Sequence, residues 1–248
     1  MTVTRLLLLG GTTEALTLAG RLAEAPGLEV ISSLAGRTVA HRLPPGRVRV
    51  GGFGGVAGLK AFLAAESIGR VIDATHPFAA TISRHAATAC AEVGVPRLQV
   101  LRPAWQPGPG DRWIAVPDMA AAAAALPGLA RTAFLAVGRQ ELAAFAGLKG
   151  VRLVVRMVEA PAGALPLEQS EVILARGPYG VADEAALFAR YGIEAVVSKN
   201  SGGDATVAKL TAARQCGLPV VMIRRPAPPP GEPVPTIEEA LSWLDRRR

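Results

Sequence analysis

Three short segments of the chain carry residues that bind anions or move protons. They are Gly10–Glu14, Asp73–His76 and Lys199–Asp204, and each lies between an apolar run and a helical pattern. At such a junction glycine lets the backbone approach a ligand, and the N–H groups at the helix start attract negative charge. His76 could also donate a proton near neutral pH. The segments therefore indicate phosphate or carboxylate binding joined to proton transfer.

The first segment has an incomplete dinucleotide-binding pattern. Thr12 stands where the second spaced glycine would be, and Ala15 stands where the third would be. A plain tight turn in an α/β sheet is the alternative. The end of the next strand carries no acid and one arginine, Arg37, which favours NADPH over NADH because arginine suits the ribose 2′-phosphate. An ordinary solvated loop arginine is the alternative for Arg37.

Basic residues follow the ends of several predicted strands in the second half of the chain. Arg139, Arg176 and Lys199 each follow an apolar run, so they could face one ligand that carries several carboxylates. Each arginine taken alone could equally be a surface charge. Asp204 could simply cap the helix that follows it.

The elements that position these residues alternate between strand and helix patterns. Such alternation predicts an α/β fold of two Rossmann-like domains with mostly parallel sheets and an active-site cleft between them. The expected domains are 1–102 and 113–248, with 103–112 as a proline- and glycine-rich linker. Strands are expected at 5–9, 28–33, 47–50, 70–73, 96–101, 113–116, 132–137, 151–158, 171–175, 195–198 and 219–223. Helices are expected at 15–22, 59–66, 76–93, 118–126, 140–145, 182–191 and 206–216, and after the cap Thr236.

Composition limits the function classes. The 248 residues are 50% hydrophobic and 19% charged, which excludes intrinsic disorder. The net charge of +7 suits an anionic partner or a solubilising surface. Aromatic residues make up only 4%, and no basic run is interleaved with them, so nucleic acid is not expected. Two scattered cysteines predict a protein of the reducing cytoplasm. Together with three histidines they have no metal-ligand spacing, so no metal site is expected. The apolar runs are too short for a membrane helix, so none is expected either.

The three motifs together resemble the precorrin-6A reductase family of cobalamin biosynthesis. Leu-Gly-Gly-Thr-Thr-Glu-Ala, Asp-Ala-Thr-His-Pro-Phe-Ala and Ser-Lys-Asn-Ser-Gly-Gly occur in the family's order over nearly the whole chain. The resemblance implies two Rossmann-like domains and an oxidoreductase that uses NADPH to reduce one double bond of precorrin-6A, giving precorrin-6B. The partner would be this anionic tetrapyrrole, and transient contacts with neighbouring pathway enzymes are a further expectation.

The resemblance also assigns site residues. Those expected to bind the cofactor are Gly10, Gly11, Thr12, Thr13, Glu14, Ser33, Arg37, Thr38, Asp73, Thr75, Lys199, Asn200 and Ser201. Those expected to bind the substrate are His76, Arg139, Arg176, Tyr179, Gly202 and Gly203. The proton donor stays open among water, His76, Tyr179, Lys199 and Asp204.

Two other functions compete with the reductase. A non-catalytic NADP(H)-binding sensor or partner module on the same fold would bind NADPH without consuming it. A small-molecule methyltransferase would bind S-adenosylmethionine, and the argument from Arg37 speaks against it. The sequence leaves open whether the macrocycle contains cobalt.

Overall fold

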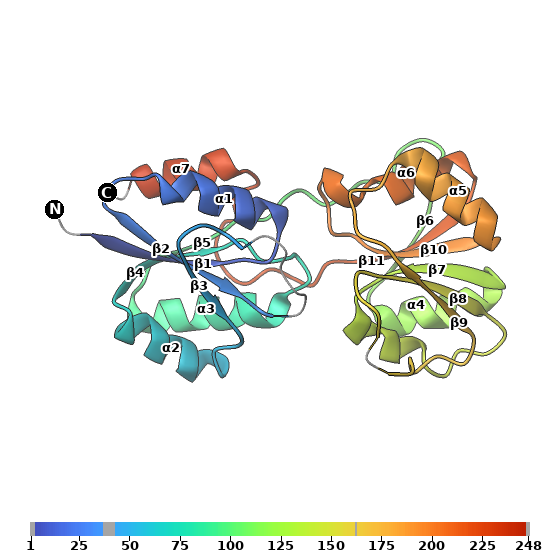
Figure 1. Cartoon of the computed structure of the whole chain (residues 1–248), viewed down its shortest axis with the longest axis horizontal. Coiled ribbons are helices and arrows are strands. Elements are labelled where there is room, and N and C mark those ends of the chain that lie inside the picture. The colour runs from blue at the N-terminus through green and yellow to red at the C-terminus, as the bar shows by residue number, and fades with distance from the viewer. Residues whose placement is uncertain (1–2, 37–42, 162, 247–248) are drawn as a thin grey trace. The chain divides into compact units, whose positions relative to one another are not determined.

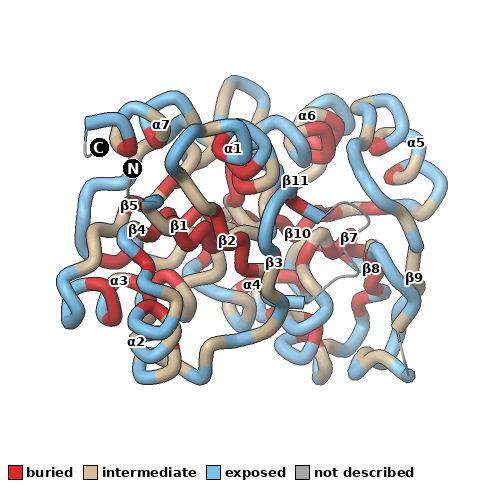
Figure 2. Tube along the Cα trace, turned by 60° about the vertical axis from the view of Figure 1, so that its left-hand side comes forward, coloured by how far each residue is buried: buried red, intermediate tan, exposed pale blue. Residues whose placement is uncertain are grey.

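The computed structural model describes residues 3–36, 43–161 and 163–246. It confirms the predicted α/β class, with two parallel sheets that each belong to a separate compact unit (Figure 1). The central strands of both sheets are buried along most of their length (Figure 2). No helix in the described ranges has both the length and the hydropathy needed to cross a bilayer.

The sheet of the first unit has the order β3-β2-β1-β4-β5, and every pair is parallel. The chain moves outward from β1 in one direction and then restarts at β4 on its other side. The switch point between β1 and β4 is where ligands bind in doubly wound sheets. The strands are β1 (Thr4–Leu9), β2 (Leu28–Leu34), β3 (Arg47–Val50), β4 (Ile68–Asp73) and β5 (Arg97–Gln99).

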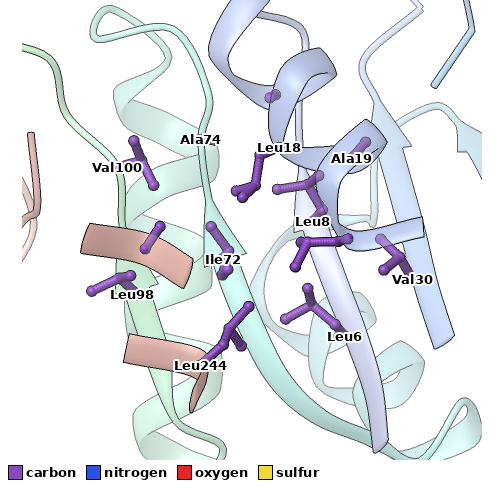
Figure 3. Close-up of a cluster of buried hydrophobic side chains, with 13 residues drawn as sticks. Leu6, Leu8, Leu18, Ala19, Val30, Ile72, Ala74, Leu98, Val100 and Leu244 are labelled. Carbon is purple, nitrogen blue, oxygen red and sulfur yellow. The ribbon is translucent and has the colours of Figure 1, made fainter. Parts of the chain in front are cut away.

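Helices cover both faces of this sheet. The helices are α1 (Thr13–Ala23), α2 (Gly55–Ala65), α3 (Ala80–Val93) and α7 (Ile237–Asp245). Figure 1 shows α1 and α7 on one face of the sheet and α2 and α3 on the other. Alternate residues of β1 point to opposite faces, so Leu6 and Leu8 pack under α1 and α7, whereas Leu7 and Leu9 pack against α2 and α3. Figure 3 shows the first of these clusters, in which Leu244 of α7 completes the layer formed by Leu6, Leu8 and Leu18.

The predicted domain boundaries need correction at the C-terminal end. The first unit comprises 1–103 together with 226–248, and the second comprises 104–225. The last helix returns to the first unit because Ala240 and Leu244 fill its core, and Val234 forms a parallel bridge with Val100. The segment 103–112 is not a free linker either, since Trp105 packs into the core of the second unit.

The second unit carries a six-stranded parallel sheet in the order β6-β11-β10-β7-β8-β9. Its switch point lies between β10 and β7. Helices α5 and α6 cover one face of this sheet, and α4 covers the other (Figure 1). The strands are β6 (Arg112–Val116), β7 (Thr132–Ala136), β8 (Arg152–Met157), β9 (Ser170–Leu174), β10 (Ala195–Lys199) and β11 (Pro219–Ile223). The helices are α4 (Met119–Ala125), α5 (Val181–Tyr191) and α6 (Ala208–Gln215), with 3₁₀ turns η1 (Leu126–Gly128), η2 (Arg139–Phe145) and η3 (Asp204–Thr206).

Two helix starts differ from the prediction by four residues. Helix α3 begins at Ala80 and not at His76, because His76–Ala79 form a turn in which the His76 carbonyl accepts from the Ala79 N–H at 2.7 Å. Helix α2 begins at Gly55, four residues before the predicted start, since two glycines with positive φ turn the chain into it. The earlier start of α2 brings its N-terminus closer to the end of β3, whereas the later start of α3 leaves His76–Ala79 as a turn between β4 and the helix. The predicted cap Thr236 is confirmed, as its hydroxyl accepts from the Glu239 N–H at 3.2 Å.

Candidate functional site

A pocket of about 770 Å³ lies at the carboxyl edge of the first sheet. The turns after β1, β2 and β4 line it, as does the loop after β3, so it opens at the switch point of this sheet. Its volume is within the range of small-molecule sites. The sequence motifs Gly10–Thr13 and Thr75–His76 meet here, although more than 60 residues separate them.

The glycine turn after β1 has a shape that lets a ligand approach the protein backbone closely. Gly11 has φ +108°, in the region that favours glycine, and a Cβ on Gly10 would lie 3.4 Å from both Ala15 and Leu34. Thr12 is the N-cap of α1: its hydroxyl accepts from the Ala15 N–H at 3.1 Å and donates to the Ala74 carbonyl at 2.8 Å. The residue that breaks the glycine pattern thus ties the turn after β1 to the end of β4.

Three helix starts face the pocket. Its lining includes the first residues of α1, α2 and α3, and helix geometry leaves the first N–H groups of each helix without an intrahelical acceptor. The described part of the lining contains no Asp, Glu, Lys or Arg side chain. Helix dipoles and backbone amides therefore supply positive potential at the surface of this hollow, and they suit phosphate groups.

Two predicted cofactor residues lie behind the pocket wall. Asp73 is fully buried and accepts from both the N–H and the hydroxyl of Thr75, at 3.2 and 2.7 Å. Arg97 lies 3.7 Å from its other oxygen. Glu14 forms an ion pair with Arg102 at 2.7 Å. Neither carboxylate lines the pocket: Asp73 contacts it through Thr75, whereas Arg102, the partner of Glu14, lies outside the lining too.

Histidines supply the titratable side chains of the described lining. His76 lies on the turn after β4, and its Nδ1 accepts from the Phe78 N–H at 3.2 Å, which leaves Nε2 to carry the proton of the neutral ring. His85, on α3, also lines the pocket. Sequence reasoning did not include His85 among the site residues, because it could not see that α3 begins late enough to bring this residue to the pocket.

The predicted 2′-phosphate residues are only partly described. Ser33 lies at the end of β2 and lines the pocket. Arg37 and Thr38 lie outside the described residues. Beside Ser33, the buried Ser32 hydroxyl also lines the pocket, and it has no hydrogen-bond partner among the described atoms.

At the carboxyl edge of the second sheet, charged side chains are paired with one another. Lys199 ends β10 and contacts Glu141 of η2 at 2.9 Å across the switch point. Both ends of the Asn200 amide bond the backbone of Trp105, at 2.8 and 3.0 Å, so this side chain anchors the start of the unit. Sequence reasoning missed Glu141, because the strand patterns alone do not show that β7, which precedes it, is the neighbour of β10.

A second charged group lies deeper in the same unit. Arg156 contacts Glu184 at 2.8 Å and stacks at 3.7 Å on the ring of Tyr179. Lys209, 5% exposed, donates to the Thr206 carbonyl at 2.6 Å, and burial lowers its pKa to about 8. Burial likewise raises the pKa of Tyr179, whose hydroxyl donates to the Ala175 carbonyl at 2.8 Å.

The remaining predicted residues of this unit lie around the same edge. Arg139 and Arg176 are exposed after β7 and β9, and Asp204 is exposed at the start of η3. Ser201 is buried, while Gly202 and Gly203 both have positive φ. The edge thus carries the three predicted cations, but Lys199 already has an acidic partner.

Fold and site together define a two-unit, doubly wound α/β protein with a pocket at the switch point of its first sheet. Comparison with known proteins specifies this class further. The model of the family described as "Precorrin-6x reductase CbiJ/CobK" matches residues 5–245. The chain belongs to this precorrin-6x reductase family, which confirms the resemblance that the three motifs indicated.

Named relatives and a solved structure agree along the whole chain. A precorrin-6A reductase of Rhodococcus erythropolis is 49% identical over 98% of both chains. That of Rhodobacter capsulatus is 48% identical and covers 98% of this chain and 96% of the relative. A solved structure titled "CobK precorrin-6A reductase" superposes with a TM-score of 0.91 at 47% identity, over 98% of this chain and 96% of that one.

Proposed function

We propose that the chain reduces one carbon–carbon double bond of precorrin-6A to give precorrin-6B in cobalamin biosynthesis, with NADPH as the reductant. The single observation that carries the proposal is the match of the family model across residues 5–245. The pocket of the first unit supports it, because its glycine turn and helix starts suit the phosphates of a dinucleotide.

The residues of this pocket fit a nicotinamide dinucleotide. Gly10 and Gly11 leave room for a pyrophosphate over the start of α1, and the N–H groups of Thr13 and Glu14 would donate to it. Ser33 would lie toward the ribose end, at the carboxyl end of β2. When bound, the reduced nicotinamide supplies a hydride. The role of the protein would be to orient the nicotinamide and the macrocycle and to exclude water from the space between them.

Addition of a hydride to one carbon of the double bond requires a proton at the other. Of the four predicted donors, His76 is the one that lines this pocket, and its ring is oriented by the Phe78 N–H. We therefore assign His76 first place as proton donor. Asp73 supports it indirectly, since it fixes Thr75, the residue before His76.

The second unit would hold the substrate. Precorrins carry many acetate and propionate groups, and Arg139, Arg176 and Lys199 end strands at one edge of this unit. Guanidinium and ammonium groups bind carboxylates by charge-assisted hydrogen bonds. The same proposal places the chain in the cytoplasm, in transient contact with enzymes that supply and consume the macrocycle. The free thiols of Cys90 and Cys216 are in keeping with that compartment.

Anaerobic mixing of the protein, NADPH and precorrin-6A tests the proposal. We expect the nicotinamide absorbance to fall as the macrocycle bands shift, with one NADPH consumed per macrocycle. His76→Asn should slow this turnover while leaving NADPH binding intact. Binding of NADPH with no spectral change, for both metal-free and cobalt-containing substrate, would instead favour the sensor alternative.

A further inference from the structure

Arg49 lies behind the wall of the pocket at the ribose end. It belongs to β3, and its register partner on β2 is Ser33. The guanidinium lies 3.8 Å over the ring of Phe53 and 5.3 Å from that of Phe62. The two rings meet edge to face, with centroids 5.2 Å apart. This stacking fixes the plane of the guanidinium.

Three hydrogen bonds connect this guanidinium to groups that line the pocket. Nη1 donates to the Ser33 hydroxyl at 2.9 Å and to the Gly51 carbonyl at 2.8 Å, and Nη2 donates to the Gly52 carbonyl at 2.9 Å. Ser33, Gly51, Gly52 and Phe53 all belong to the pocket lining. One side chain therefore shapes the whole wall formed by the ends of β2 and β3.

The charge of Arg49 is not balanced by an acid in the described part of the chain. Among the described residues its guanidinium forms no ion pair, whereas that of Arg47, two residues earlier on the same strand, pairs with Glu66 at 2.6 Å. Burial without an acidic partner lowers the pKa of Arg49, although the group stays protonated. A half-buried, unbalanced cation behind a pocket without charged side chains in its described lining attracts an anion there.

The contact with Arg49 also sets the role of the Ser33 hydroxyl. A hydroxyl has one hydrogen to donate, and here its oxygen accepts from Arg49, so the hydrogen is left for a ligand acceptor. The end of the second strand is where dinucleotide-binding folds read the ribose 2′ position. A 2′-phosphate offers acceptor oxygens and negative charge at that point, whereas a 2′-hydroxyl offers no charge.

We infer that Arg49 is a positioning residue that makes this pocket select a ribose 2′-phosphate over a 2′-hydroxyl, acting through the Ser33 hydroxyl and the Gly51–Gly52 backbone. The inference rests on the proposed use of NADPH. It adds a determinant on β3 to the loop after β2, where the sequence had suggested Arg37.

The test is the ratio of the NADH and NADPH dissociation constants, measured by calorimetric titration. Arg49→Met should lower this ratio by about tenfold or more, through weaker NADPH binding, because a charge-assisted interaction is lost. Arg49→Lys keeps the charge but cannot hold three acceptors in one plane, so its ratio of dissociation constants should lie between those of the wild type and Arg49→Met. Arg47→Met is the matched control, and we expect it to leave the ratio unchanged.

Ser33→Ala keeps the inference testable if Arg49→Met does not fold. It should lower the ratio several-fold, since it removes the prepared donor and little volume. An unchanged ratio in the folded variants, or equal loss of both dinucleotides, would overturn the role of Arg49. A wild-type protein without preference for NADPH would overturn the proposed cofactor as well, so the two failures are distinguishable.

Discussion

The two sheets present opposite kinds of surface at their carboxyl edges. In the first unit the described pocket lining is uncharged apart from two histidines, and it offers backbone amides and helix starts. In the second unit the edge carries charged side chains, and Lys199, Arg156 and Lys209 lie near the acids Glu141 and Glu184. The same topology thus supports recognition by backbone in one unit and by side-chain charge in the other.

The largest expected effect concerns buried charge in the second unit. In Glu184→Ala, Arg156 and Lys209 lose their counter-charge while remaining buried, which should cost roughly 3–5 kcal/mol of unfolding free energy. The measurement is urea unfolding in a Trp243→Phe background, which removes the tryptophan fluorescence of the first unit. The remaining signal, from Trp105 and Trp113, then reports on the second unit.

Glu14→Ala is the matched control, because it removes another glutamate from the first turn of a helix and another arginine partner. Its pair with Arg102 is more exposed, with side chains 28% and 18% accessible, so the loss should be about 1 kcal/mol or less. Here unfolding is followed with Trp243 intact. Equal losses in the two variants would refute the contrast between the units.

The next effect is on pH dependence. Lys209 has its pKa lowered from 10.5 to about 8, mainly by burial, with Arg156 adding to the shift. Between pH 8 and 10.5 the unfolded chain holds a proton that the folded chain has released, so stability rises with pH across this window and is level below it. The rise amounts to roughly 3 kcal/mol. Lys209→Met should remove it, and the difference between the two proteins cancels other titrating groups.

In the first unit the strongest variant is Gly11→Val. A β-branched residue at φ +108° is strained, and its side chain would enter the pocket. Loss of two charge-assisted N–H contacts at roughly 1.5–3 kcal/mol each should weaken NADPH binding by about a hundredfold or more. Gly20→Ala, at an open position on the same helix, should bind NADPH like the wild type.

A smaller effect, on the KM for precorrin-6A, distinguishes a substrate-binding role of the Lys199–Glu141 pair from a purely structural one. Lys199→Ala should raise the KM for precorrin-6A by about tenfold, because a carboxylate loses its cation. Glu141→Gln should lower that KM, since it frees the same ammonium group from its pair. A purely structural role of the pair predicts that both changes act in the same direction, so the sign of the second effect decides.

The regular elements could be predicted from sequence because their local signals were strong. Leu6–Leu9 ends at two glycines, and the observed β1 and α1 follow that pattern. The predicted start of α3 was wrong because Pro77 is compatible both with the first turn of a helix and with the non-helical turn His76–Ala79 that the structure has. The place of α7 was also wrong, since an amphipathic helix does not specify which of two cores it covers.

The site was predictable in its motifs but not in its contacts. Glycine turns and strand ends are local features, so Gly10–Thr13 and Thr75–His76 could be placed at one edge. Pairings such as Lys199 with Glu141, or Arg49 with Ser33, depend on strand order and register. The local patterns that predict strands and helices do not specify that order.

The return of α7 to the first unit has a consequence for synthesis of the chain. The segment 104–225, contiguous in sequence, can leave the ribosome and fold as a whole. The first unit lacks Ala240 and Leu244 until the final residues emerge, so the part of the sheet face that α7 covers stays exposed through most of translation, with α1 alone on that face. The first unit therefore gains its last core residues only after the whole second unit has been synthesised, so the order in which the two units are completed differs from the order in which they begin.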